Sequence, residues 1–138
     1  MADLIRITPD LERAKAINKM VDTTLLMIQE IDKTKFASHV TKEYYDAVRE
    51  LMNIILLLDG YKITGDKAHK ELIDYIRTNY ELPEHDITLV DNLRITRNKI
   101  AYDGFFVPQD YIERTEPKIK NIVEILKSLV NNKLNRQD

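Results

Sequence analysis

Five polar side chains recur along one segment of the sequence at the spacing of an α-helix. They are Asp91, Arg94, Arg97, Asn98 and Tyr102. Two arginines on neighbouring turns can both fork onto phosphate oxygens, and an amide and a phenol can hydrogen-bond a sugar or a base edge. These residue types therefore favour the binding of a phosphate-bearing ligand.

Arg97 stands out because it falls on the apolar side of that segment. At ~100° per residue, Val90, Leu93 and Ile100 share one side of a helix, and Arg97 lies among them. A guanidinium is costly to bury without a partner. Three explanations are open: Arg97 pairs with a carboxylate of another helix, it lies at a partly wet subunit interface, or it contacts a phosphate.

The composition excludes several other kinds of site. The chain of 138 residues has no cysteine, which excludes disulfides, thiolate nucleophiles and cysteine-ligated zinc. The histidines, His39, His69 and His85, lack metal-ligand spacing, and there is no glycine-rich phosphate loop, so we predict neither a metal nor a cofactor. His69 lies beside Lys67 and Lys70; a phosphate contact is one interpretation of this group, and a solvated basic surface is the one we favour.

The charges of the chain are nearly balanced, with 21 basic and 23 acidic residues and a net charge of −2. Any nucleic-acid binding therefore depends on a local basic patch. The start of the chain lacks a basic region followed by an apolar run. The longest fully apolar stretch, 54–58, is far shorter than the ~20 residues of a membrane-spanning helix. We expect a cytoplasmic protein without membrane contact.

The elements that must position the polar residues are predicted to be helices, because only 3 glycines and 4 prolines interrupt the chain. Thr8 and Pro9 suit the start of a first helix, which the apolar pattern extends to about Lys33. Either Ser38 or Thr41 can cap a second helix, whose broad apolar stripe predicts a central place in the core.

Glycine and proline mark the limits of the later elements. Gly60 is predicted to end the second helix, and 61–65 is expected to be a loop. Two further helices are predicted over about 66–79 and 86–102, the latter ended by Asp103 and Gly104. Pro108 is expected to open a short helical turn. Because Pro117 would break a continuous helix, the last long helix is predicted to begin near Glu116.

The predicted elements indicate one all-α domain over residues 1–138, folded as an up-and-down four- or five-helix bundle. No strand-like alternation of apolar and polar residues is evident. The core is expected to span about 8–131, and the polar tail, 131–138, is expected to fray.

The segment around Arg97 resembles the signature of the HEPN family. That signature is an arginine, usually followed by a polar residue, and then a histidine after four to six intervening residues; here the run from Arg97-Asn98 to Gly104 is similar to it. The segments 44–49 and 56–62 resemble the second helix and following turn of many HEPN proteins, and 68–73 resembles the third helix. Order and spacing agree over nearly the whole chain.

The resemblance implies a HEPN-like helical bundle that forms a homodimer, in which the motif helices of two protomers meet in one composite cleft. Many HEPN proteins are metal-independent ribonucleases, and several of these are toxins of toxin–antitoxin pairs. Others are noncatalytic RNA-binding or nucleotide-binding proteins. Some are encoded beside a small nucleotidyltransferase, which is then a candidate partner.

Tyr102 stands where the family signature has its histidine. A phenol, with a reference pKa of ~10, is a poor base at neutral pH, although it can donate to an oxyanion or stack on a base. The resemblance thus implies that Arg97 and Asn98 contact a ligand. The candidates for a catalytic role are Arg97, Asn98 and Tyr102. Arg94 and Asp91 are further candidates for binding.

The sequence therefore predicts a dimer that binds RNA or a nucleotide around the helix 86–102. Catalysis is not expected from a site in which a tyrosine replaces the motif histidine. Two alternatives stay open. One is a noncatalytic protein–protein interaction module, for instance the partner of a nucleotidyltransferase, and the other is a weak metal-independent endoribonuclease.

Overall fold

The computed structural model describes residues 3–137 of the chain, and most of them are helical. Within this range there are five helices and one antiparallel pair of short strands. In chain order these elements are β1 (Asp3–Arg6), α1 (Leu11–Glu30), α2 (Ala37–Asp59), β2 (Tyr61–Thr64), α3 (Ala68–Asn79), α4 (Glu84–Asp103) and α5 (Tyr111–Gln137).

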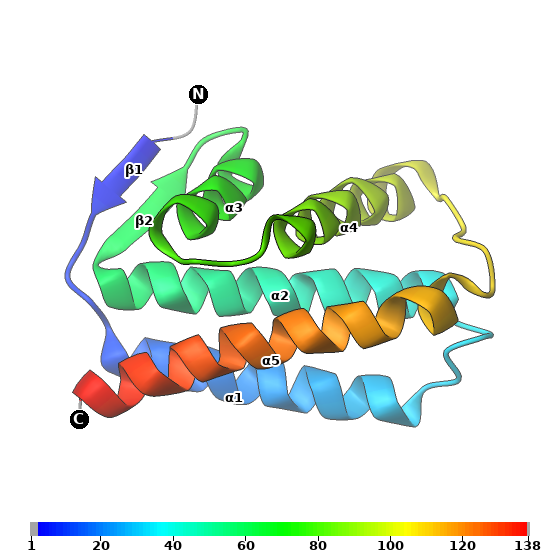
Figure 1. Cartoon of the computed structure of the whole chain (residues 1–138), viewed down its shortest axis with the longest axis horizontal. Coiled ribbons are helices and arrows are strands. Elements are labelled where there is room, and N and C mark those ends of the chain that lie inside the picture. Colours follow the sequence, from blue (N-terminus) through cyan, green and yellow to red (C-terminus); the bar gives the residue numbers. More distant parts are fainter. Residues whose placement is uncertain (1–2, 138) are drawn as a thin grey trace.

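Helix α2 forms the centre of the fold. Figure 1 shows α1 and α5 along one side of α2, and α3 and α4 along the other. The four long helices alternate in direction along the chain, as predicted for an up-and-down bundle (Figure 1). Because α2 is covered on both sides, its apolar residues are buried around most of the helix, including Tyr44, Val48, Leu51 and Ile55 of the predicted stripe.

The small sheet corrects the prediction of a loop at 61–65. Residues 61–64 form β2, which pairs with β1 so that Leu4 lies opposite Ile63 and Ile5 opposite Lys62. Tyr61 and Ile63 are half-buried against the core, whereas Lys62 and Thr64 are exposed. An alternation of four residues is too short to indicate a strand by itself, and the pairing with a segment far away in the sequence is what forms one.

Two predicted helix starts also differ in the structure. Asp10, and not Thr8, caps α1: its carboxylate oxygen accepts from the backbone N–H of Arg13 at 3.0 Å. Helix α1 ends at Glu30, short of Lys33. Neither candidate caps α2, which begins at Ala37; the Ser38 hydroxyl instead accepts from the backbone N–H of Val107, at 2.9 Å. The predicted end of α2 is confirmed, since Gly60 adopts φ 88° and its N–H bonds the last carbonyls of the helix.

Helix α5 is longer at both ends than predicted. It begins at Tyr111 and continues through Pro117, so the expected break is wrong. The proline removes one backbone hydrogen bond near the helix start, and the burial of Ile112 and Thr115 holds this turn in place. The expected fraying is also wrong for the described residues of the tail, because Leu134 is buried and Lys133 binds Asp59.

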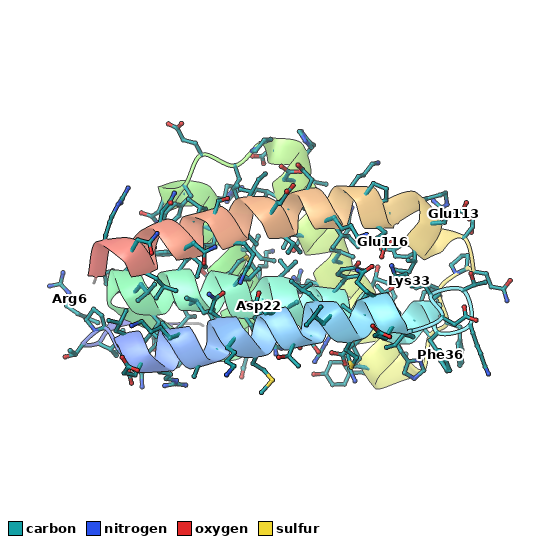
Figure 2. The ribbon with its side chains drawn as sticks, turned by 90° about the horizontal axis from the view of Figure 1, so that it is seen from below. Arg6, Asp22, Lys33, Phe36, Glu113 and Glu116 are labelled. Carbon is teal, nitrogen blue, oxygen red and sulfur yellow. The ribbon has the colours of Figure 1, made fainter. Side chains whose placement is uncertain are left out.

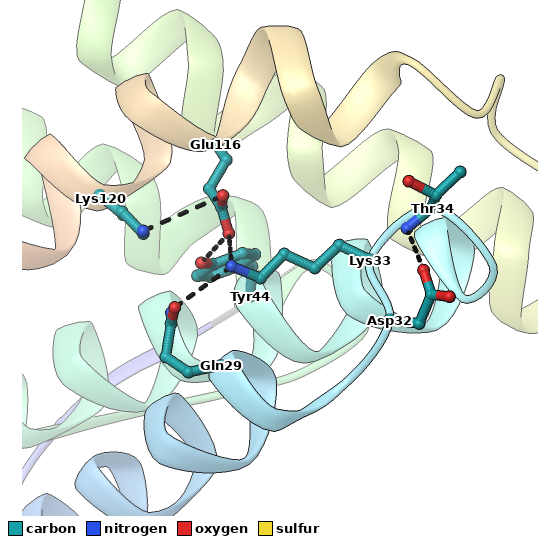
Figure 3. Close-up of polar contacts among 7 residues, drawn as sticks. All are labelled: Gln29, Asp32, Lys33, Thr34, Tyr44, Glu116 and Lys120. Atoms are coloured by element: carbon teal, nitrogen blue, oxygen red, sulfur yellow. Dashed lines mark hydrogen bonds and ion pairs between the residues drawn. The ribbon is translucent and has the colours of Figure 1, made fainter.

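A polar cluster centred on Glu116 ties α5 to α2 and to the loop after α1 (Figure 3). Its carboxylate oxygen Oε2 accepts from the Tyr44 hydroxyl at 2.6 Å and lies 2.8 Å from the Lys33 ammonium. Lys120 lies 3.9 Å from the other oxygen. Burial acts to raise the pKa of Glu116, but the hydrogen bonds from Lys33 and Tyr44 outweigh it and lower that pKa.

Candidate phosphate-binding cleft

The structure gives Arg97 a carboxylate partner on a neighbouring helix, which is the first of the three explanations for its place on the apolar side of α4. Its side chain is 14% exposed, and its Nε lies 3.3 Å from Oδ1 of Asp46 on α2. Neither of these two buried atoms has a hydrogen bond of good geometry. The guanidinium also donates to the side-chain oxygen of Asn98, at a long 3.5 Å. Arg97 is thus paired in charge but loosely held.

Tyr45 adds a third unsatisfied atom at the same place. Its side chain is fully buried and its hydroxyl has no hydrogen-bond partner. Burial raises the pKa of Tyr45 to about 12, against the opposite effect of the nearby guanidiniums of Arg49, Arg94 and Arg97.

Among the described residues, the buried side-chain atoms without a partner are few, and most of them gather here. They belong to Tyr45, Asp46 and Arg97, with one further oxygen on Asp86. Such atoms are rare in folded proteins, and a group of them calls for an explanation, such as a bound water, a bound ion or a functional role.

A pocket of about 410 Å³ lies directly beside this cluster, between the start of α3 and the second half of α4. The α4 wall consists of three residues predicted from the sequence, Arg94, Asn98 and Tyr102. The opposite wall is formed by the turn before α3, with Lys67, and by the first residues of α3, with His69 and Lys70. Arg94 charges the α4 wall, two lysines and one carboxylate, Asp66, charge the other wall, and the start of a helix adds the partial positive charge of its free amides.

The predicted site residues therefore divide into three groups. Arg94, Asn98 and Tyr102 line the pocket, while Arg97 does not line it and lies against α2. Asp91 lines a different pocket and acts on the site through Arg94, whose Nε donates to the Asp91 carboxylate at 3.0 Å. Because Arg94 is 19% exposed and held in this way, its guanidinium is placed in advance for an anion.

The sequence interpretation of a solvated basic surface holds for Lys67 and Lys70, which are exposed, but not for His69. The ring is half-buried in the pocket wall, with its centre 6.4 Å from that of Tyr45. Burial lowers the pKa of His69, and the guanidiniums of Arg49 and Arg97 lower it further, so the imidazole is neutral at pH 7. The sequence held one weak signal for this wall, the basic run from Lys67 to Lys70, but nothing that paired it with α4.

The chemistry that this arrangement supports is anion binding with a neutral imidazole close by. In residues 3–137 there is no group of three or more histidine, aspartate or glutamate side chains that could hold a metal ion. Over the same range no helix is long and apolar enough to cross a membrane.

No known protein family, curated protein or solved structure matches this chain significantly.

Proposed function

We propose that the protein binds RNA or a nucleotide through its phosphate groups, in the cleft between the start of α3 and the second half of α4. The observation that carries the proposal is the meeting of the Arg94–Asn98–Tyr102 wall with the basic start of α3 in one pocket of about 410 Å³. Phosphate oxygens are strong acceptors for arginine, lysine and free helix amides.

Each wall residue has a distinct part in this proposal. Arg94 forks onto phosphate oxygens, and Lys67 and Lys70 supply further charge from the opposite wall. The Asn98 oxygen accepts from Arg97, so its side-chain amide group is what donates to the ligand. Tyr102 is 76% exposed at the edge of the pocket, where its ring can stack on a base.

The proposal includes HEPN-like ancestry and homodimer formation, both of which rest on the sequence resemblance alone. A nucleotidyltransferase partner belongs to the same group of sequence-based proposals. Gel filtration of the purified protein, alone and with such a partner, tests these assemblies. A noncatalytic interaction module would form the assembly and show no affinity for RNA.

Binding is tested by fluorescence anisotropy with labelled single-stranded RNA in the presence of a chelator, with unlabelled nucleotides as competitors. Arg94→Gln is expected to weaken binding about tenfold, which corresponds to about 1.4 kcal/mol. Arg97→Ala is also expected to weaken binding, because it removes charge from behind the pocket, and the fold is expected to survive.

Arg77→Gln is the matched control for Arg94→Gln. Arg77 is an arginine near the far end of α3 that pairs with an aspartate three residues earlier, Asp74, at 3.2 Å, just as Arg94 pairs with Asp91. It lies outside the proposed cleft. Equal affinity of the Arg94→Gln and Arg77→Gln variants, or no binding by the wild type, would contradict the proposal.

A second candidate function is metal-independent cleavage of RNA. It is favoured by the neutral imidazole of His69 in the same pocket as Arg94, because an imidazole can take a proton from a ribose hydroxyl at neutral pH. Incubation with RNA and a chelator compares the wild type with His69→Gln and Tyr102→His. Cleavage that His69→Gln abolishes supports this candidate, and absence of cleavage by the wild type leaves binding alone.

A further inference from the structure

Helix α1 carries large apolar side chains outside the side that it buries in the core. Its inner side buries Ala14, Val21 and Ile28. Large apolar side chains nevertheless remain exposed on the rest of the helix: Met20 is 66% exposed, Leu26 69% and Met27 41%. Packing within one chain does not account for these side chains.

Two of these side chains, Met20 and Met27, belong to a row of exposed residues that has the spacing of a coiled-coil seam. Its members follow one another at alternating steps of three and four residues, the pattern that keeps one side of a helix against a partner helix. All of them are exposed in the structure: Arg13, Ala16, Met20, Thr23, Met27 and Glu30. The Thr23 hydroxyl donates to the carbonyl of Lys19 at 3.2 Å, so Thr23 can present its methyl group to a neighbour.

This seam is complementary to itself when read in the opposite direction. An antiparallel copy of α1, centred between Met20 and Thr23, places Arg13 opposite the partner's Glu30 at each end. Inside these charge pairs, the small Ala16 meets the partner's Met27, and Met20 meets the partner's Thr23. Large side chains thus face small ones, and opposite charges close both ends, which is what a two-fold symmetric contact requires.

We propose that a second copy of this chain packs antiparallel along the outer side of α1. The order of side chains in the seam favours a copy of the chain over an unrelated partner, since every position finds its complement within the same helix. Leu26, which flanks the seam, would be covered by the same contact.

The proposed contact leaves the phosphate-binding cleft open. Figure 2 shows α1 at the outer surface of the bundle, and Figure 1 places α3 and α4 on the opposite side of α2. A dimer through α1 therefore carries two independent clefts that face outward. This differs from a dimer in which two copies of α4 meet, and it stands whether or not the cleft binds RNA.

The first test is the mass in solution, measured by analytical ultracentrifugation over a range of concentrations. The wild type is expected at twice 16.2 kDa. Met20→Lys and Met27→Lys are each expected to weaken the dimer at least tenfold while circular dichroism stays unchanged. Phe106→Lys is the matched control, because Phe106 is 78% exposed but follows α4.

The end pairs allow a test by exchange of charge. Arg13→Glu and Glu30→Arg are each expected to weaken the dimer, and the double variant is expected to restore it. A monomeric wild type, or a dimer that only Phe106→Lys dissociates, would overturn the proposal. The second of these results would place the interface beside α4.

Cysteine cross-linking tests the direction of the two helices, since residues 3–137 contain no cysteine. Ala16→Cys and Met27→Cys should form a disulfide when the two variants are mixed. Neither should form one alone, because identical positions are then about 16 Å apart along the helix, beyond disulfide reach. Efficient cross-linking of either variant by itself indicates a parallel or shifted contact and refutes the antiparallel arrangement.

Discussion

The cluster around Asp59 and the cluster around Arg97 both place charged side chains against α2, but their hydrogen bonding differs. Both carboxylate oxygens of Asp59 have partners. Oδ1 accepts from the Lys133 ammonium at 2.6 Å, and Oδ2 accepts from the hydroxyls of Tyr75 and Tyr80 at 2.7 and 2.6 Å. These partners come from α3, from the residue after it and from α5, so one carboxylate joins three parts of the fold.

The cluster around Arg97 contains similar groups in a looser arrangement. Its central ion pair to Asp46 is 3.3 Å long, and the Tyr45 hydroxyl beside it has no partner. Arg97 and Lys133 are nearly equal in side-chain exposure, 14% and 18%. Burial alone therefore does not distinguish the two clusters.

The difference shows how a structural cluster and a candidate site can be told apart. A fully satisfied network stabilises the fold, whereas buried donors and acceptors without partners reduce its stability. Proteins tolerate such groups where a water, an ion or a ligand can bind them or where function requires them, and here they adjoin the cleft.

The largest expected effect separates the two carboxylates. Asp59→Asn is expected to lower the free energy of unfolding by about 2–4 kcal/mol, because it leaves the Lys133 ammonium without its counter-charge and weakens two hydrogen bonds. Asp46→Asn is expected to cost about 1 kcal/mol or less, because its bond to Arg97 is poorly formed. Urea unfolding followed by circular dichroism measures both, and equal losses would remove the distinction.

An intermediate effect separates the tyrosines. Tyr80→Phe is expected to cost about 1.5 kcal/mol, since it deletes a hydrogen bond to a charged acceptor. Tyr45→Phe removes a hydroxyl that has no partner, so the free energy of unfolding should stay the same or rise by up to about 1 kcal/mol. Thermal and urea unfolding of both variants give these values. A loss of stability in Tyr45→Phe would show that its hydroxyl is bonded in solution.

The smallest effect concerns the pH dependence of stability. The folded-state pKa of His69 lies below its ordinary value of 6.5, so the folded protein binds this proton less readily than the unfolded chain does. Stability should therefore decrease as pH falls below about 6.5, and His69→Gln should remove this decrease. The groups that face His69 are Arg49, Arg94 and Arg97, which oppose its protonation, and Asp46, which favours it.

The same measurement of stability against pH distinguishes the contribution of Asp59 from that of His69. Burial acts to raise the pKa of Asp59, but the hydrogen bonds from Lys133, Tyr80 and Tyr75 outweigh it and hold that pKa below 3.8. Its contribution is therefore present above pH 3.8 and is lost only as pH falls further, with or without His69. A stability decrease between pH 7 and 5 that persists in His69→Gln would show that another group is responsible.

The sequence by itself determined the helices and the unusual position of Arg97. Apolar residues at helical spacing and the glycines Gly60 and Gly104 act within one or two turns of chain, so their effect can be read locally. The limits of α3 and α4 were predicted within two residues for the same reason. Arg97 was evident because a permanent charge interrupted an apolar stripe.

Only the tertiary structure decided which residues meet. The pairing of β1 with β2, the partner of Arg97 on α2 and the continuation of α5 through Pro117 all depend on contacts between segments far apart in the sequence. The place of His69 opposite Arg94 is of the same kind. Such contacts have no local pattern, because the free energy that selects them arises only when the packed helices exclude water together.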